Sequence, residues 1–126
     1  MEFFEEVERQ NVEIEALKDL LQISAFPSLC GSIDSVISEN HNGGEIYCIW
    51  GQFKVSREVI RNGVRFALVD CPHAFAWTIT YHADRNALVV HCTIDDREEE
   101  EEFIETIQQF ASDWRLGLGI AVQENT

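Results

Sequence analysis

The chain has 126 residues and a formal net charge of −14, from 9 Lys and Arg against 23 Asp and Glu. This charge repels phosphate, so it argues against binding to nucleic acid or to an anionic membrane, and it favours a protein partner that is basic. Hydrophobic residues make up 45% of the sequence, which is too much for a disordered acidic chain, so we expect a single folded domain over residues 1–126.

The N-terminal segment has no positively charged region and no apolar stretch long enough for a signal peptide or a membrane span. We therefore expect a cytoplasmic protein whose four cysteines are reduced thiols. The sequence contains no CxxC pair, no nucleophile elbow, no HExxH pair and no phosphate-binding loop. It predicts no cofactor and no catalytic residue, and it favours a protein that is not an enzyme.

Apolar residues with helical spacing begin the chain. Phe3, Val7, Ile14, Leu17 and Leu21 fall near one face of a helix. The pattern predicts a helix over residues 12–22, capped by Asn11, with an extension toward residue 3 that Asn11 can interrupt. The Phe26-Pro27 step marks an end beyond the last turn of this helix.

Two strands are expected next. Residues 33–38 predict a strand that turns at residues 40–44, where Asn and Gly cluster. The continuous apolar run at residues 46–50 predicts a strand buried on both faces, with Gly51 after it as a bulge.

The segment from Ser56 to Gly63 has two interpretations. It is either a hairpin that turns at Asn62-Gly63 or a short helix capped by Ser56 and stopped by Gly63. The hairpin would place Arg57 and Arg61 opposite apolar residues, so we favour the short helix.

An alternating hairpin follows and is the most informative part of the sequence. Odd residues over 75–82 and even residues over 88–94 are apolar, and Ala83-Asp84-Arg85-Asn86 joins the two strands. The expected register sets 82 opposite 87, 81 opposite 88, 79 opposite 90 and 77 opposite 92. Both apolar sets, including Trp77, then share one face of the sheet.

A strand over residues 64–70 is expected beside this hairpin, with 64 opposite 81 and 66 opposite 79. The opposite face of the sheet then carries a polar and mildly basic set: Arg65, Thr78, Thr80, His82 and His91. This face is either an ordinary solvated surface or a binding site for a partner or small molecule. His82 and His91 lie about 13 Å apart in the expected register, at about 3.3 Å per residue, so one metal ion cannot hold both.

The C-terminal part predicts a helix over about residues 97–115. Phe103, Ile107, Phe110 and Trp114 form its apolar stripe, Asp96 is the expected N-cap, and Gly117 is the expected stop. Residues 118–122 are expected to add an edge strand.

An acidic tract precedes the apolar stripe of this helix, and its glutamates lie in the first turns. It consists of Asp95, Asp96, Glu98, Glu99, Glu100, Glu101 and Glu102. The tract either attracts the surface of a basic partner or only keeps a small protein soluble.

Metal binding and nucleophilic catalysis have one candidate location. Cys71 and His73 flank Pro72 in the loop before the hairpin, so two metal-ligand or thiolate–imidazole groups lie close together. The alternative is a turn made rigid by proline that carries an incidental thiol.

These elements predict an α+β domain, in which an antiparallel sheet of about four to six strands carries an N-terminal and a C-terminal helix on one face. The first functional hypothesis is a non-enzymatic protein-binding domain, and a homodimer, that resembles a chaperone or neutralises a basic partner. The alternative is a small-molecule or metal-binding protein that uses the polar face or the Cys71/His73 loop.

Overall fold

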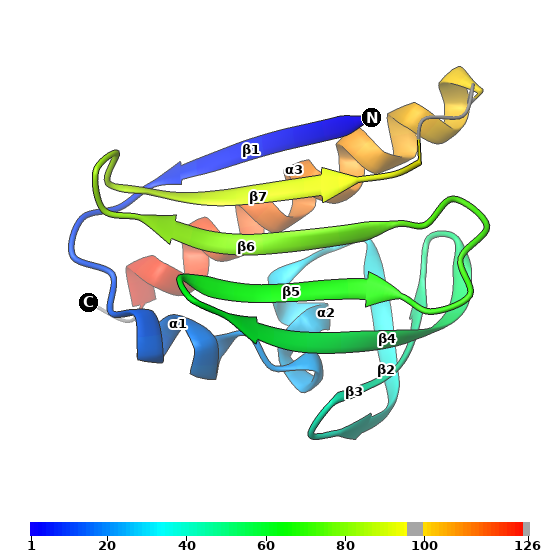
Figure 1. Cartoon of the computed structure of the whole chain (residues 1–126), viewed down its shortest axis with the longest axis horizontal. Coiled ribbons are helices and arrows are strands. Elements are labelled where there is room, and N and C mark those ends of the chain that lie inside the picture. The colour runs from blue at the N-terminus through cyan, green and yellow to red at the C-terminus, as the bar shows by residue number, and fades with distance from the viewer. Residues whose placement is uncertain (96–99, 125–126) are drawn as a thin grey trace.

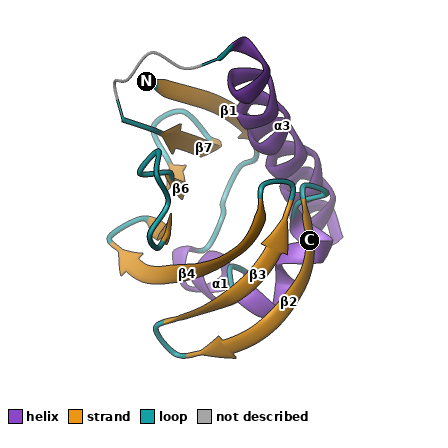
Figure 2. Ribbon diagram, turned by 90° about the vertical axis from the view of Figure 1, so that its right-hand side faces the viewer, coloured by secondary structure: helices purple, strands orange, loops and turns teal. Residues whose placement is uncertain are grey.

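A curved antiparallel sheet encloses one long helix in this protein. The computed structural model describes residues 1–95 and 100–124, and within them seven strands form one sheet in the order β1-β7-β6-β5-β4-β3-β2. The helix α3 (Glu101–Glu124) runs behind the sheet in Figure 1 and closes the open side of its curve in Figure 2. The other elements are β1 (Glu2–Glu8), α1 (Ile14–Leu20), a 3₁₀ turn η1 (Ile23–Ala25), α2 (Phe26–Leu29), β2 (Ile33–Asn40), β3 (Gly43–Cys48), β4 (Gly51–Ile60), β5 (Gly63–Leu68), β6 (Ala76–His82) and β7 (Ala87–Thr93).

The predicted antiparallel α+β class is present, but the described residues form seven strands where four to six were expected. The β6–β7 hairpin has the predicted register, with Trp77 opposite Cys92 and His82 opposite Ala87. Trp77 is 1% exposed. The inner face of the sheet therefore carries the apolar set, as the alternation of the sequence predicts.

The register between β5 and β6 differs from the prediction by two residues. Val64 lies opposite Ile79, and Phe66 lies opposite Trp77. Matching apolar residues defines a register only to within steps of two, because side chains repeat every second residue. The hydrogen bond from Leu68 N to Phe75 O belongs to the observed register, in which the connection between the two strands is two residues longer than in the predicted one.

The segment 56–63 belongs to strand β4 and its turn, so the preferred prediction of a short helix is wrong. Arg57 does lie opposite Phe66 on the inner face. Its guanidinium donates hydrogen bonds to the carbonyl oxygens of Leu21 and Lys18, each at 2.9 Å, at the end of α1. The last carbonyl groups of a helix have no partner within the helix, so they can accept these hydrogen bonds. They stabilise the Arg57 charge on a face that is otherwise apolar. A Cβ atom at Gly63 would overlap with the backbone of Ile79, so this glycine allows two strands to approach rather than ending a helix.

The β2–β3–β4 part of the sheet is more extensive than predicted. β2 and β3 form a hairpin that turns between Asn40 and Gly43. Tyr47 of β3 is exposed on the outer face, so this strand is not buried on both faces. Gly51 adopts a left-handed φ of 115° at the tight turn between β3 and β4, where a bulge was expected.

The first residues form a strand instead of the predicted extension of the N-terminal helix. β1 pairs with β7, and Phe3, Glu5 and Val7 are half-buried, whereas Phe4 and Glu6 between them are exposed. A spacing of four residues fits one face of a strand as well as one face of a helix, so Phe3 and Val7 alone do not distinguish the two structures. α1 covers residues 14–20 of the predicted 12–22 and buries Leu17, and its N-cap is Glu13 instead of Asn11.

Helix α3 is longer than predicted, and the edge strand expected over residues 118–122 is wrong. Leu118 is a buried residue of the helix. A Cβ atom at Gly117 would overlap with the backbone of Leu29, so this glycine lets α3 pass close to α2 and does not end the helix. The expected cap Asp96 lies outside the described residues.

Rings fill the space between the sheet and the middle of α3. Phe26 and Phe66 have centroids 4.8 Å apart, and Trp77 and Phe110 have centroids 5.0 Å apart. Trp114 is fully buried and meets Phe26 at 5.3 Å in an edge-on contact. The Nε1–H groups of Trp77 and Trp114 are buried and have no acceptor in the described part of the chain. Two clefts lie toward the two ends of the helix, beside Phe103 and beside Val122.

Candidate functional site

An aromatic cleft opens beside the first turns of α3. It has a volume of about 280 Å³ and lies between the β3–β4 turn, the β5–β6 connection and the helix. Its lining consists of Trp50, Phe53, Leu68, Cys71, Pro72, His73, Phe75 and Phe103. Most of these side chains are half-buried, so their apolar surfaces are accessible from the cleft.

Hydrogen bonds hold the rings of the aromatic cleft in place. Trp50 Nε1 donates to Thr106 Oγ1 at 2.9 Å, and the Thr106 hydroxyl donates to the Phe103 carbonyl oxygen at 2.6 Å. The Trp50 ring also packs against Phe75, with centroids 4.9 Å apart. Two elements far apart in the sequence are therefore joined at the cleft, and its walls are formed before any ligand arrives.

The Cys71-Pro72-His73 loop forms another wall of this cleft. Ala74 N–H donates to the Cys71 carbonyl oxygen at 3.0 Å, and the His73 ring lies 4.2 Å from Phe103 between centroids. The sequence singled out Cys71 and His73, and the structure places both at a concave site. Among residues 1–95 and 100–124, no group of three or more His, Cys, Asp and Glu side chains could hold a metal ion.

Burial separates Cys71 from the other three cysteines, and all four are free thiols. Burial raises the pKa of the Cys30 thiol to about 12 and that of the Cys92 thiol to about 12. Burial also raises the pKa of Cys48. These three thiols therefore stay neutral and behave as small apolar side chains, whereas the half-buried Cys71 faces the aromatic cleft.

The predicted polar set shares the outer face of the sheet. Arg65 lies opposite Thr78, and Thr78 lies opposite His91. On the same face, Thr80 Oγ1 and His82 Nε2 lie 2.9 Å apart. Thr80 and His82 therefore contact each other on this face, and the cleft that collects apolar side chains lies elsewhere.

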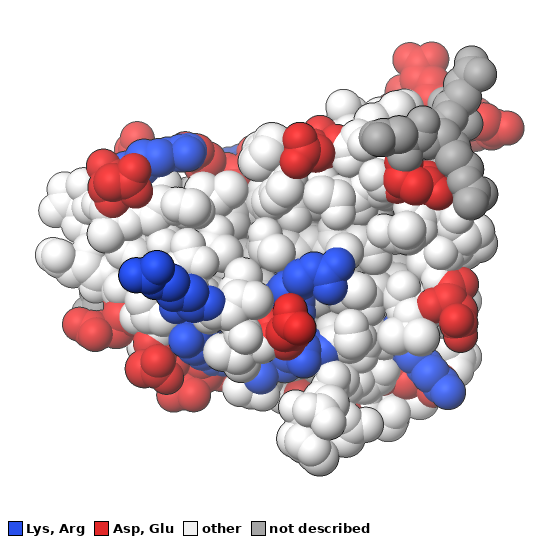
Figure 3. Space-filling view, viewed as in Figure 1, with Lys and Arg blue, Asp and Glu red and all other residues white. Residues whose placement is uncertain are grey.

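Strand β1 adds residues to this outer face that the sequence analysis missed. His91 Nε2 lies 2.9 Å from Glu2 Oε1, and the Phe4 ring stacks on His91 with centroids 4.3 Å apart. The missed signal is the alternation of β1 itself, which we interpreted as part of a helix. Figure 3 views this face and shows Lys and Arg gathered over β4 and β5.

The described residues of the acidic tract lie near the aromatic cleft. Glu100, Glu101 and Glu102 are exposed where α3 begins, and Figure 3 shows acidic side chains gathered there. Asp95 N–H donates to the His73 carbonyl oxygen at 3.0 Å. The remaining members, Asp96, Glu98 and Glu99, lie outside the described residues.

Neither a protein-family model nor a curated protein matches this sequence. Two solved structures resemble its fold. An uncharacterised protein from Bacillus thuringiensis has a TM-score of 0.63 and 16% identity over 96% of each chain. A START superfamily protein from Mycobacterium smegmatis has a TM-score of 0.67 and 10% identity over 100% of this chain and 98% of its own. At such identities the resemblance shows a shared fold alone.

In the described residues, no helix is long and apolar enough to cross a membrane.

Proposed function

We propose that the protein binds a small apolar molecule that contains a ring, in the aromatic cleft. The observation that carries this proposal is the lining: three half-buried rings, Trp50, Phe53 and Phe103, face a concave space of about 280 Å³. Concave sites lined by aromatic side chains with a few polar groups are the usual form of small-molecule sites. This site lies at the Cys71/His73 loop and not on the polar outer face.

Size and charge restrict the ligand. A cavity of about 150 Å³ holds benzene, so a cleft of almost twice that volume accommodates one or two fused rings. The ligand's rings would stack on Trp50 and Phe103. The carboxylates of Glu100 to Glu102 stand near the opening and disfavour anions. A neutral or cationic ring compound therefore fits best.

A calorimetric titration with three neutral aromatics, cresol, naphthol and quinoline, tests this proposal. We expect saturable binding of at least one compound, and Phe53→Ala should weaken it at least fivefold because one aromatic wall of the cleft is removed. Phe4→Ala is the matched control, since this ring lies on the outer face, and it should leave the affinity unchanged. The proposal fails if none of the three binds saturably, or if both variants weaken binding equally.

A second function, binding of a basic protein segment, rests on the open edge of β1. Met1 pairs with Ile94 and Arg9 N–H bonds to Asn86 O. Because pairing alternates along an antiparallel strand, the backbone groups of Glu2, Phe4, Glu6 and Glu8 point away from β7. β1 is the first strand in the sheet order, so these groups face an edge where the described residues form no further strand.

Apolar side chains of α3 stand beside this edge. Leu116 is 54% exposed and Ile120 is 59% exposed, and both line a groove with Val7 of β1. An extended partner could add a strand to β1 and place alternate apolar side chains on Leu116 and Ile120. The glutamates of β1 and the net charge of −14 favour a basic partner over a second copy of this acidic chain.

A synthetic peptide of alternating Lys and Val is the probe for this second function. Its binding should weaken several-fold between low and high ionic strength, and a Leu116→Ser, Ile120→Ser double variant should abolish it. Ile37→Ser is the control, because this exposed residue lies on β2 at the other edge of the sheet. Salt-independent binding would contradict the electrostatic part. A dimer that the double variant dissociates would assign the groove to a second copy instead.

A further inference from the structure

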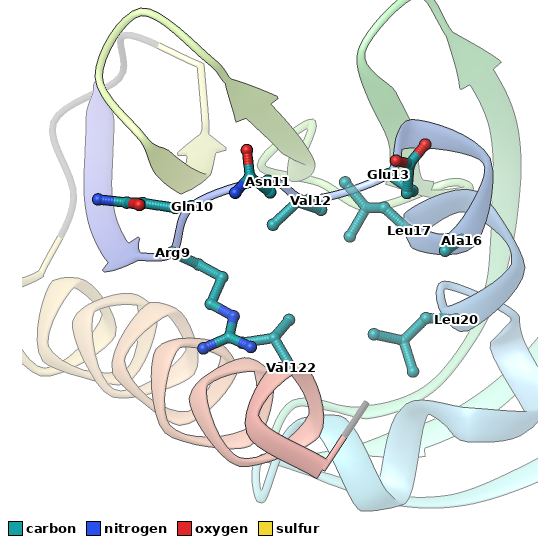
Figure 4. A pocket seen from close by; sticks show the side chains of 9 residues that line it. All are labelled: Arg9, Gln10, Asn11, Val12, Glu13, Ala16, Leu17, Leu20 and Val122. Atoms are coloured by element: carbon teal, nitrogen blue, oxygen red, sulfur yellow. The ribbon is translucent and has the colours of Figure 1, made fainter. Parts of the chain in front are cut away.

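A second cleft lies at the other end of α3, about 28 Å along the helix from the aromatic cleft at about 1.5 Å per residue. It has a volume of about 150 Å³, and we name it the Arg9 cleft. Its apolar walls come from Val12, Leu17 and Leu20 on the α1 side and from Val122 on α3. Figure 4 shows the Arg9 side chain reaching toward Val122, so that its guanidinium borders this apolar space.

Arg9 is held firmly at its backbone, whereas its guanidinium has no ion-pair partner within the described part of the chain. Its N–H donates to the Asn86 carbonyl oxygen at 2.9 Å, and the buried Tyr81 hydroxyl donates to the Arg9 carbonyl oxygen at 3.0 Å. Among the residues that the structure describes, no carboxylate forms an ion pair with Arg9. By contrast, Arg85 pairs with Glu6, and Arg115 with Glu5 at 3.4 Å.

A polar depression adjoins the Arg9 cleft and shares Arg9, Gln10 and Asn11 with it. Asn11 and Asn86 in this depression both have left-handed backbones, with φ of 57° and 49°. Such conformations persist only where the surroundings hold them, and they gather at functional sites. Because Arg9 lines both the apolar cleft and the polar depression, its guanidinium lies at the boundary between them.

Two carboxylates near the site limit the charge of a ligand. Glu13 lines the cleft on the α1 side, beside Leu17 and away from the guanidinium in Figure 4. Glu8 lines the adjoining depression. The Arg9 guanidinium can compensate one carboxylate, whereas a second anionic group would meet Glu8 or Glu13.

We propose that the Arg9 cleft binds a small apolar monocarboxylate. The carboxylate pairs with the Arg9 guanidinium, and the hydrocarbon part lies among Val12, Leu20 and Val122. A cavity of this volume holds a benzene ring, so the hydrocarbon part has about six carbons. This site is separate from the aromatic cleft, which favours neutral or cationic rings, and it adds a second class of ligand.

Titration of the full chain with hexanoate at neutral pH, in parallel with hexanol, tests the proposal. We expect saturable binding of hexanoate, weakened at least tenfold in Arg9→Gln, since a charge-assisted hydrogen-bonded pair is lost. Arg9→Lys should retain part of the affinity. Hexanol should bind Arg9→Gln and the native protein equally, and Leu20→Ser should weaken both compounds.

Arg61→Gln is the matched control, because it removes the same charge at the exposed β4–β5 turn and should leave hexanoate binding unchanged. Equal losses in Arg9→Gln and Arg61→Gln would overturn the proposal in favour of a general charge effect. It is also overturned if hexanoate does not bind saturably or binds Arg9→Gln as well as the native protein. Loss of hexanoate binding in Phe53→Ala, with Arg9→Gln unaffected, would overturn the proposal and move the ligand to the aromatic cleft.

Discussion

The middle of α3 and its two ends are built for different tasks. In the middle, Phe110 and Trp114 lie against rings of the sheet and fill the interior. At the ends, Phe103 and Val122 border open clefts. The aromatic core in the middle therefore stabilises the fold, whereas the clefts at the two ends are available to bind ligands. Substitutions in the middle should change stability, and substitutions at the ends should change binding.

The largest effect is expected from Trp77→Ala in the middle. Removing this buried ring leaves a cavity and should lower the free energy of unfolding by about 3–5 kcal/mol, measured by urea denaturation. Trp50→Ala at the aromatic cleft removes a half-buried ring and should cost less. A larger loss in Trp50→Ala than in Trp77→Ala would contradict the comparison.

Gly117→Ala tests the contact between α3 and α2. The added methyl group would overlap with the Leu29 backbone and should lower the free energy of unfolding by about 1–3 kcal/mol. Gly119→Ala is the matched control, because a Cβ atom there meets nothing within 4 Å. It should raise stability by up to about 1 kcal/mol through helix propensity. Thermal unfolding of both variants gives the two signs directly.

Alkaline pH should destabilise the buried middle. Cys30 and Cys92 have pKa values raised to about 12 by burial, from an ordinary value of about 9. Above pH 9 the unfolded chain releases these protons and the folded chain keeps them, so stability falls as pH rises. Integrating the linkage relation for two thiols gives a loss of about 2 kcal/mol between pH 9 and pH 10.

Denaturation of a Cys30→Ala, Cys92→Ala double variant at the same two pH values is the control for this alkaline effect. The variant should show a smaller loss than the native protein. An equal loss would assign the effect to other groups.

In the native fold at pH 8, a thiol reagent should modify Cys71 well before the other three cysteines, because Cys71 is half-buried and the others are buried.

The smallest effect is expected on the outer face. His91→Ala should change the free energy of unfolding by no more than about 0.5 kcal/mol, because its contacts with Glu2 and Phe4 are exposed. Denaturation at neutral pH measures this change. A loss above about 1 kcal/mol would show that this face contributes to the fold more than the comparison allows.

Alternation predicted the centre of the sheet and failed where two patterns coincide. The β6–β7 register follows from parity, because a slip by one residue would turn Trp77 outward. In β1, Phe3 and Val7 fit a strand or a helix equally, so only pairing with β7 decides. In β4, the position of Arg57 depends on carbonyl groups of α1 that lie far away in the sequence. Tertiary partners of this kind leave no local signal.

The candidate site was predicted in part for the same reason. Cys71 and His73 are neighbours in the sequence, so their shared loop could be identified. Trp50 comes to the same cleft from the β3–β4 turn and Phe103 from α3. The Trp50–Thr106 hydrogen bond joins these two elements. The sequence offered an aromatic residue at the end of a strand and another at the start of a helix, but nothing that placed them side by side.

The indole N–H resonances of the three tryptophans show whether a ligand binds at the end of α3 or in its filled middle. We expect an aromatic ligand to shift the Trp50 resonance in a ¹⁵N–¹H spectrum and to leave those of Trp77 and Trp114 in place, because the interior is already filled. Shifts of Trp77 and Trp114 with Trp50 unchanged would contradict it. The ligand would then enter the middle of the fold and pair with the two buried N–H groups.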